Sequence, residues 1–233
     1  MAREVGAVLT IATLLPDLLG TYGDGGNGLV LAQRARLRGV HALLVPVALD
    51  EKIPEASIYL LGGGEDGPQR LACDLLSSSS FVEHVKDGAT VFAVCAGLQI
   101  LGHSFSVEGN DKYQGLGIVD AETTRGTTRS VGELCVRVGE RLLVGFENHG
   151  GHTTLGPGTS PIGDVLRGRG NDGGVDGYRT GNIWATYAHG PVLALNPWLA
   201  DAVLESVLGY ELEPMHGVAD RLYAERCAAL IRR

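Results

Sequence analysis

The sequence predicts an α/β fold with an open, mostly parallel, doubly wound sheet and an antiparallel extension. Short apolar runs alternate with segments of helical period up to residue 103, a pattern typical of a parallel sheet covered by helices. After residue 105 the pattern changes to glycine-rich turns and short strands, which favours antiparallel pairing. Ligands of open α/β sheets bind outside the carboxyl ends of the strands, so we expect the functional site there.

The apolar runs define the expected strands and helices. Four runs predict parallel strands, at residues 5–12, 40–47, 57–61 and 90–94. Apolar stripes at helical spacing predict helices at 29–37, 69–76, 98–101, 197–208 and 217–231. The strands expected in the antiparallel extension are 133–138, 142–147 and 183–187.

Composition limits the domain organisation and the partners. The chain has 233 residues and no linker, repeat or low-complexity run longer than Ser77–Ser80, so we expect one domain over residues 1–233 with a helical tail at about 210–233. With 27 acidic against 19 basic residues the net charge is −8, the wrong sign for a nucleic acid partner. The hydrophobic share of 44% is enough for a packed core.

The cysteine pattern and the first residues indicate the compartment. The four cysteines, at 73, 95, 135 and 227, form neither a CxxC pair nor a disulfide scaffold, so a reducing compartment is expected. The sequence starts without a signal-peptide pattern, and no apolar stretch approaches the ~20 residues of a membrane span. We therefore expect a cytoplasmic protein.

Cys95 has the sequence setting of a catalytic nucleophile. The apolar strand at 90–94 runs directly into Cys95, which is followed by the small residues Ala96 and Gly97 and then by a helix. This is the strand–turn–helix setting of a nucleophile elbow, with sulfur in place of the serine oxygen. A sharp turn exposes the sulfur, and a helix N-terminus lowers the pKa of a thiol from its usual ~8.5. The alternative is a buried structural cysteine, which is how we interpret the other three.

A thiolate that attacks a carbonyl also needs a base and donors for the oxyanion. Gly62–Gly64 follows the third expected strand, on the same sheet edge as Cys95, and its backbone amides can face a ligand; a plain tight turn is the alternative. Of the seven histidines, His189 follows an apolar strand and so also lies at a strand end. His149 and His152 lack zinc spacing and a third ligand, so no metal is expected.

Several segments together resemble the class I, triad-type glutamine amidotransferases, and within them the cobyric-acid-synthase-like branch. These segments are Leu61-Gly-Gly-Gly64, Cys95-Ala-Gly-Leu-Gln99, Gly145-Phe-Glu-Asn-His149 and Thr186-Tyr-Ala-His189-Gly190. Within that branch the chain resembles the glutaminase subunits of lipid II isoglutaminyl synthases in Tyr22-Gly-Asp-Gly-Gly-Asn27, Gly62-Gly-Gly-Glu-Asp-Gly-Pro-Gln69 and His189-Gly-Pro-Val-Leu-Ala-Leu-Asn-Pro197. The resemblance covers roughly residues 8–208 and implies a flavodoxin-like sheet.

The resemblance implies a role for the nucleophile and its surroundings. Cys95 would attack the side-chain amide of glutamine, and His189 would protonate the departing ammonia and then activate water. Gly63 and Ala96 would donate backbone N–H groups to the oxyanion.

The resemblance also implies residues that bind glutamine. Arg129 matches the position at which the family holds the α-carboxylate of glutamine, and a planar guanidinium suits that role. A surface arginine is the alternative. Gln99, in the segment after the nucleophile, is expected to line the same site.

A partner subunit is implied as well. In the family, a Mur-ligase-like, ATP-dependent synthetase takes the ammonia in a heterodimer and amidates the α-carboxylate of D-glutamate in the lipid II stem peptide, a step of peptidoglycan synthesis. This sequence has neither a GxxxxGK[ST] phosphate loop nor a GxGxxG motif after a strand. We therefore expect no cofactor in this chain, and ATP and magnesium on the partner.

Two departures from the family pattern matter. Ala93 stands where the usual elbow has glycine, and Pro191 stands where the usual triad has its glutamate, two residues after His189. In the isoglutaminyl synthase group an aspartate of the ligase subunit is thought to complete the triad, so the resemblance implies a third carboxylate from the partner. Glu147 is a rival within the chain.

Two other functions remain open at this point. The same Cys–His site could supply ammonia to another acceptor such as a corrinoid, although the chain has no room for the ligase domain that such synthases carry. The chain could also be a non-catalytic scaffold subunit that kept the fold. The intact Cys95, His189 and Gly62–Gly64 argue against that interpretation.

Overall fold

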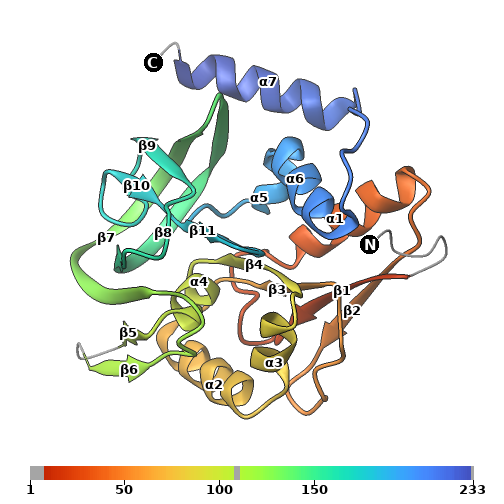
Figure 1. Ribbon diagram of the computed structural model, residues 1–233. Coiled ribbons are helices and arrows are strands. Elements are labelled where there is room, and N and C mark those ends of the chain that lie inside the picture. The colour runs from red at the N-terminus through yellow and green to blue at the C-terminus, as the bar shows by residue number, and fades with distance from the viewer. Residues whose placement is uncertain (1–7, 108–110, 232–233) are drawn as a thin grey trace.

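The main sheet of the protein has six strands. The computed structural model describes residues 8–107 and 111–231. The strands of the sheet are β1 (Leu9–Leu14), β2 (Ala42–Val47), β3 (Ile58–Leu61), β4 (Thr90–Val94), β11 (Tyr178–Thr180) and β12 (Ile183–Thr186). Their order across the sheet is β11-β12-β4-β3-β1-β2 (Figure 1). All neighbours pair in parallel except β11, which is antiparallel to β12 at one edge.

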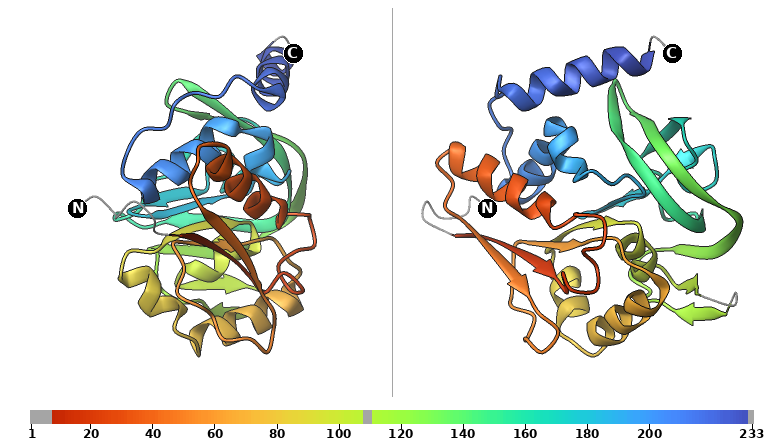
Figure 2. Two further views of the ribbon diagram at one scale, coloured as in Figure 1. Left: turned by 90° about the vertical axis from the view of Figure 1, so that its right-hand side faces the viewer. Right: turned by 180° about the vertical axis from the view of Figure 1, so that it is seen from behind.

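Helices cover both faces of this sheet. The helices of one face are α1 (Gly26–Leu37), α5 (Val192–Leu195) and α6 (Pro197–Leu208). Those of the other face are α2 (Asp66–Ser77), α3 (Phe81–Lys86) and α4 (Ala96–Leu101). The two helical layers are separated by the sheet in the edge-on view of Figure 2. This arrangement confirms the predicted doubly wound α/β class.

The centre of the sheet is the hydrophobic core. Every residue of β3, β4 and β12 is buried, because these strands have helices on both faces. Such strands are continuous apolar runs in the sequence, as in Thr90–Val94, rather than alternating patterns. The carboxyl ends of these three adjacent strands therefore emerge from a rigid, close-packed platform.

A second sheet lies beside the first. Its strands are β5 (Ser104–Ser106), β6 (Lys112–Gln114), β7 (Ala121–Val138), β8 (Arg141–Leu155), β9 (Gly163–Arg167) and β10 (Val175–Asp176). They are ordered β10-β9-β7-β5-β6, with β8 paired to β7 in a long antiparallel hairpin. The register of this hairpin shifts between Arg125 and Ser130, so Arg129 lies in an irregular part of the strand.

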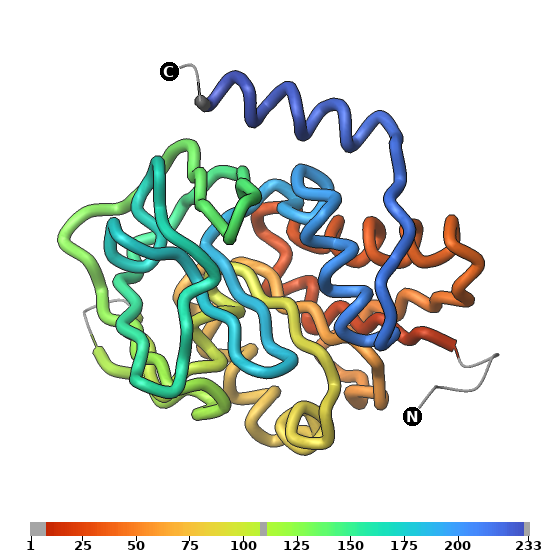
Figure 3. Tube along the Cα trace, turned by 45° about the horizontal axis from the view of Figure 1, so that its top comes forward, coloured from red at the N-terminus to blue at the C-terminus, as the bar shows by residue number. Residues whose placement is uncertain are grey.

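The last helix, α7 (Val218–Ile231), lies apart from the other layers. It crosses over α5 and α6 toward the end of the β7–β8 hairpin (Figure 3). Its contact with the hairpin includes a hydrogen bond of 2.7 Å that the Tyr223 hydroxyl donates to the Leu142 carbonyl. Over residues 8–107 and 111–231, no helix combines the length and the apolarity needed to cross a membrane.

The structure corrects several expectations about elements. Of the strand predicted at 5–12, residues 5–7 lie outside the described residues, Val8 is not in a strand, and the observed strand Leu9–Leu14 extends two residues further than predicted. The helix Phe81–Lys86 was not predicted, because six residues are too few for a clear helical period. The strand expected at 183–187 as part of the antiparallel extension instead pairs in parallel with β4, in the main sheet. Its apolar residues are buried on both faces, as in the other central strands.

A buried carboxylate ties the second sheet to the end of β12. Asp176 is 0% exposed, and it accepts hydrogen bonds from the Thr186 hydroxyl and from the Tyr187 N–H, the latter at 3.2 Å. The Thr186 oxygen in turn accepts a hydrogen bond of 3.0 Å from the Ala188 N–H. Asp176 thus fixes the segment that follows β12. Burial raises the pKa of Asp176 from 3.8 to about 6.

The raised pKa predicts the sign of a pH effect on stability. Below pH ~4 the carboxyl group is protonated in both the folded and the unfolded state. Between pH ~4 and ~6 only the folded state keeps the proton, so the free energy of unfolding decreases as the pH rises. We expect the unfolding free energy of the wild type to fall by about 3 kcal/mol over this window relative to Asp176→Asn, which does not titrate. Urea unfolding at a series of pH values measures the difference; parallel pH profiles would contradict it.

Candidate active site

Three adjacent strands bring the predicted site segments to one edge of the main sheet. Cys95 follows β4, the Gly62–Gly64 turn follows β3, and His189 follows β12. The Cys95 N–H donates a hydrogen bond of 3.0 Å to the Thr186 carbonyl, and the Gly97 N–H donates one of 3.1 Å to the Gly62 carbonyl. The parallel register of these strands therefore places all three segments side by side, at the carboxyl ends where ligands bind in such sheets.

The elbow at Cys95 is present. Cys95 has φ 51° and ψ −106°, a positive φ that a non-glycine residue rarely adopts, and helix α4 begins at the next residue. The turn is close to β3, since a Cβ atom on Gly97 would lie 2.6 Å from the Leu61 Cβ. Ala93, which replaces the usual glycine two residues before the cysteine, is fully buried within β4. The structure thus accommodates this departure from the family pattern.

The thiol of Cys95 is not the low-pKa group that the sequence predicted. The residue is only 5% exposed, and burial, followed by the negative charge of Asp24, raises the pKa of its thiol to about 12. The Ala96 amide and the charge of Arg129 act in the opposite direction but are smaller. The prediction is wrong because helix α4 starts inside the core, where the loss of hydration at the sulfur outweighs the pKa-lowering effect of the Ala96 amide.

His189 is held in a closed slot. Its side chain is 0% exposed, and its ring lies 4.6 Å from the ring of Tyr22 and 5.4 Å from that of Phe146, centroid to centroid. Its Nδ1 is 3.0 Å from Oδ2 of Asp24, while Nε2 is buried and has no hydrogen-bond partner in the described protein. Within residues 8–107 and 111–231, no hydrogen bond joins the Cys95 sulfur to His189.

Asp24 is a site residue that the sequence analysis missed. It lies in the Tyr22–Asn27 segment between β1 and α1, which was noted only as a mark of family resemblance. The signal was its position after a central strand, since the carboxyl end of β1 lies next to that of β3. Within this chain Asp24 thus contacts Nδ1 of His189, and the carboxylate that the resemblance assigns to the partner stays a prediction.

The predicted oxyanion donors differ in their present contacts. The Gly63 N–H donates a hydrogen bond of 2.9 Å to Oδ2 of Asp24. Glycine is required at this position because a Cβ atom would lie 2.6 Å from Cε1 of His189. The Ala96 amide acts to lower the pKa of the adjacent Cys95 thiol. Of the two predicted donors, the Gly63 amide thus belongs to the Asp24–His189 contact, and Ala96 is the one that influences the sulfur.

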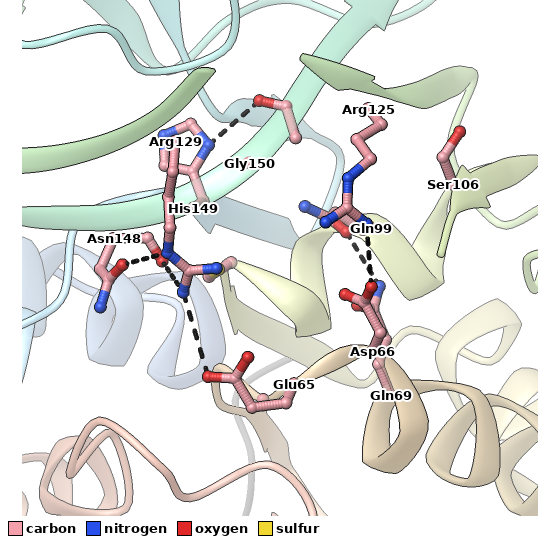
Figure 4. A pocket seen from close by; sticks show the side chains of 13 residues that line it. Glu65, Asp66, Gln69, Gln99, Ser106, Arg125, Arg129, Asn148, His149 and Gly150 are labelled. Atoms are coloured by element: carbon pink, nitrogen blue, oxygen red, sulfur yellow. Dashed lines mark hydrogen bonds and ion pairs between the residues drawn. The ribbon is translucent and has the colours of Figure 1, made fainter. Parts of the chain in front are cut away.

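A pocket beside Cys95 contains two arginines and two acidic residues (Figure 4). Arg125 and Arg129 reach into it from β7, toward Glu65 and Asp66 at the start of α2. Arg125 lies 3.1 Å from Asp66, and Arg129 lies 4.0 Å from Glu65. The pocket thus presents both charges a short distance from the nucleophile, which suits a zwitterionic ligand.

Arg129 is fixed in this pocket by neutral partners. Its Nε donates a hydrogen bond of 2.7 Å to the Asn148 side chain, and its terminal nitrogen donates one of 3.0 Å to the Tyr22 hydroxyl. The same hydroxyl donates to Glu65 at 2.6 Å. The side chain of Arg129 is 50% exposed, so it keeps access to solvent and to a ligand. Arg129 is thus a half-exposed arginine whose position in the pocket is set by these hydrogen bonds, and its role in glutamine binding stays a prediction.

Gln99 lies at the back of the pocket. It is 8% exposed, and both polar atoms of its side-chain amide make hydrogen bonds. The oxygen accepts one of 2.9 Å from the Gln69 side chain, and the nitrogen donates one of 3.1 Å to the Tyr187 hydroxyl. The Tyr187 hydroxyl also hydrogen-bonds the Thr153 hydroxyl at 2.7 Å. This buried polar chain links α2, α4 and the end of β12 to the second sheet. Gln99 therefore shapes the wall of the pocket through its neighbours.

Glu147, the rival acid within the chain, serves a different histidine. It contacts His149 at 3.3 Å and accepts hydrogen bonds from the N–H groups of Arg169 and Gly170. Burial alone would raise its pKa, but the hydrogen bonds from His149 and Gly170 hold the pKa below its usual value. In the part of the chain that the structure describes, no three histidine, cysteine or acidic side chains group as a metal site.

Comparison with known proteins gives relatives over most of the chain. The family model of the CobB/CobQ-like glutamine amidotransferase domain matches residues 10–197. The GatD subunit of the glutamine-hydrolysing lipid II isoglutaminyl synthase of Staphylococcus aureus is 35% identical over 216 residues, 88% of each chain. Its Streptococcus pneumoniae counterpart is 32% identical, over 86% of this chain and 80% of that protein. The cobyric acid synthase of Pelotomaculum thermopropionicum is 34% identical over 44% of this chain and 23% of its own length.

Solved structures show the same fold. A crystal structure of a glutamine amidotransferase has a TM-score of 0.56 at 19% identity and covers 85% of this chain and 99% of its own. The PurLQS structure from Thermotoga maritima contains a chain with a TM-score of 0.56 at 13% identity, covering 86% of this chain and 98% of that one. With the family model matched over residues 10–197, this chain belongs to the CobB/CobQ-like glutamine amidotransferase family.

Proposed function

We propose that this chain is the glutaminase subunit of a lipid II isoglutaminyl synthase. It hydrolyses L-glutamine at Cys95 and delivers the ammonia to a Mur-ligase-like, ATP-dependent partner in a heterodimer. The partner uses ATP and magnesium to activate the α-carboxylate of D-glutamate in the lipid II stem peptide, which the ammonia converts to D-isoglutamine. The setting of the reaction is the cytoplasmic stage of peptidoglycan synthesis.

The observation that carries this proposal is the full-length similarity to the staphylococcal GatD subunit, 35% identity over 88% of both chains. The cobyric acid synthase of Pelotomaculum thermopropionicum matches 44% of this chain. The cobyric acid synthases are also much longer proteins, since the match covers between 23% and 35% of their lengths in two examples. A corrinoid acceptor is therefore the weaker candidate.

The structure supports a thiol that is activated only during attack. Because the pKa of Cys95 is raised to about 12, the sulfur is protonated at neutral pH and needs a base. His189 is that base, through the Nε2 that Asp24 leaves free. As the sulfur attacks the amide carbon of glutamine, the thiol proton moves to Nε2 and the negative charge moves to the amide oxygen. Catalytic hydrogen bonds are often long in free enzymes and shorten when the substrate binds.

The same histidine completes the cycle. It returns the proton to the amide nitrogen, the carbon–nitrogen bond breaks, and ammonia leaves while the γ-glutamyl group stays on Cys95 as a thioester. Water then attacks the thioester as Nε2 takes its proton. The carbon–sulfur bond breaks, the sulfur regains the proton, and glutamate is released.

The pocket charges match the main-chain groups of glutamine. Arg129 binds the α-carboxylate, and the acids at the start of α2, Glu65 foremost, face the α-ammonium group. When glutamine binds, Arg129 and Glu65 no longer contact each other. Arg129 then contacts the α-carboxylate of glutamine, and Glu65 contacts its α-ammonium group. The side-chain amide reaches inward to Cys95, past the wall that Gln99 forms.

The proposed complex can be tested by comparing glutamine with ammonium chloride as the source of nitrogen for amidation. We expect the chain and its Mur-ligase-like partner to amidate lipid II with glutamine and ATP. With Cys95→Ala the complex loses amidation from glutamine and keeps amidation from ammonium chloride, because only the glutaminase step needs the thiol. Mass spectrometry of the stem peptide measures both. Amidation of a corrinoid but not of lipid II would contradict the proposal.

Among the cysteines, only Cys95 is expected to be essential for activity. Cys95→Ala and His189→Ala each abolish ammonia release from glutamine, because one removes the nucleophile and the other its base. Cys73→Ala keeps activity near the wild-type level, since this buried thiol contacts the Gln114 carbonyl in a different part of the fold. A coupled glutamate assay on the purified chain, alone and with the partner, makes the comparison. Equal losses at Cys73 and Cys95 would show that the wrong thiol was assigned.

Arg129→Ala is expected to raise KM for glutamine about tenfold or more, with kcat changed less than about threefold. The reason is that a charge-assisted hydrogen bond to the α-carboxylate is lost in the ground state and the transition state alike. Arg137→Ala is the matched control, because Arg137 lies in the same strand and its side chain is 55% exposed. Steady-state kinetics in glutamine measures both constants. An unchanged KM would remove Arg129 from the binding site.

A further inference from the structure

The ring of Tyr22 covers the base of the site. The residues that line the pocket include Cys95 but not His189, whose side chain is 0% exposed among the described residues. The ring of Tyr22 lies 4.6 Å from that of His189, centroid to centroid, and a Cβ atom on Gly63 would lie 2.9 Å from Cδ2 of the same tyrosine. The free chain therefore separates the nucleophile, which the pocket reaches, from the base, which it does not.

The hydroxyl of Tyr22 reaches the wall of the pocket. It accepts a hydrogen bond of 3.0 Å from a terminal nitrogen of Arg129 and donates one of 2.6 Å to Glu65. Both of these partners line the pocket. Burial, followed by the hydrogen bond to Glu65, raises the pKa of Tyr22 to about 12, so the hydroxyl keeps its proton at neutral pH. One neutral side chain thus extends from the base to two charged residues of the pocket.

Glutamine carries the same hydrogen-bonding pattern as this hydroxyl, with full charges. Its α-carboxylate accepts hydrogen bonds from a guanidinium, and its α-ammonium group donates them to a carboxylate. A charged partner attracts each of these ions more strongly than a neutral hydroxyl does. The side chains of Arg129 and Glu65 are 50% and 55% exposed, so a ligand can reach both. We therefore expect glutamine and the Tyr22 hydroxyl to compete for the same two side chains.

The backbone around Tyr22 leaves space for its side chain to turn outward. Thr21 and Gly23 are exposed, and a Cβ atom on Gly23 would meet nothing within 4 Å. The next residue, Asp24, is fixed, because it accepts a hydrogen bond of 2.9 Å from the Gly63 N–H. The phenol is thus held by its two hydrogen bonds and its ring contact, whereas the loop between β1 and α1 is held at Asp24. Loss of the two hydrogen bonds releases the side chain without unfolding the loop.

We propose that Tyr22 is a gating residue of the glutaminase. In the free chain its hydroxyl takes the hydrogen bonds that Arg129 and Glu65 make to bound glutamine, and glutamine releases it, which opens His189 to the pocket. The proposal rests on the glutamine hydrolysis and the roles of Arg129 and Glu65 proposed above. It explains how Cys95 and His189, which share no hydrogen bond within the described residues of the free chain, come to act on one substrate. Without glutamine the base stays covered.

The kinetic test removes one hydroxyl at a time. In the full chain, alone and with its partner, we expect Tyr22→Phe to lower KM for glutamine at least about threefold and to change kcat less than about twofold, because no hydroxyl then competes for Arg129 and Glu65. Loss of a merely structural hydroxyl would raise KM or lower kcat instead. Tyr113→Phe is the matched control and keeps both constants, since the Tyr113 hydroxyl donates a hydrogen bond of 2.6 Å to Asp74, also on α2 but outside the pocket lining. An unchanged or higher KM in Tyr22→Phe, or a kcat that falls as much as KM, would overturn the proposal.

A direct measurement uses a chain that binds glutamine without hydrolysing it. One sample of Cys95→Ala carries 3-fluorotyrosine at position 22 alone, and a second sample carries it at position 113 alone. When glutamine is added, with binding followed by calorimetry, we expect the fluorine-19 resonance at position 22 to move toward that of a solvent-exposed tyrosine and the resonance at position 113 to stay. An unmoved resonance at position 22 in glutamine-saturated protein would overturn the proposal, even if Tyr22→Phe does not fold.

The outcomes distinguish this proposal from the function on which it rests. If Cys95→Ala binds no glutamine and the wild type releases no ammonia, alone or with its partner, the proposed function fails and the gating role fails with it. If the wild type hydrolyses glutamine while KM of Tyr22→Phe and the fluorine resonance at position 22 stay unchanged, the activity stands and Tyr22 is not the gating residue.

Discussion

The buried contact between Asp24 and His189 is the interaction around which the site is arranged. A carboxylate that is 1% exposed beside an imidazole that is 0% exposed is stable only with hydrogen bonds in place of water. The Gly63 amide supplies one of them, which requires the β1–α1 loop to lie against the turn after β3. The small residues of both segments follow from that contact, since any side chain at Gly62 or Gly64 would separate the two.

The same contact sets the chemistry of the nucleophile. Burial and the charge of Asp24 keep Cys95 a neutral thiol, so the site does not hold a permanent thiolate next to an imidazolium. In the proposed reaction, the thiol proton is transferred only when the amide carbon of glutamine is in reach of the sulfur. Asp24 thus disfavours the thiolate, and the same carboxylate lies 3.0 Å from Nδ1 of His189. Such a site is expected to react slowly with other electrophiles.

In the proposed function, the second sheet contributes to substrate recognition and the parallel sheet supplies the reacting groups. Its long hairpin delivers Arg125 and Arg129 to the pocket at the point where the register between its strands shifts. The buried polar chain from Gln69 through Gln99 and Tyr187 to Thr153 connects this sheet to the helices around the nucleophile. The antiparallel strand pairs therefore form the rim of a site whose reactive groups come from the parallel sheet.

The sequence by itself determined the fold class, most of the parallel strands and the positions of Cys95 and His189 at strand ends, because buried strands are continuous apolar runs and the residues after them meet at one edge. Only the tertiary structure decided three things. The raised pKa of Cys95 depends on burial, the place of β12 in the main sheet depends on pairing between distant segments, and the carboxylate of His189 comes from Asp24, 165 residues earlier in the chain. Burial and long-range contacts have no local signature, so motif spacing showed only that Pro191 replaces the usual glutamate and could not reveal the carboxylate after β1.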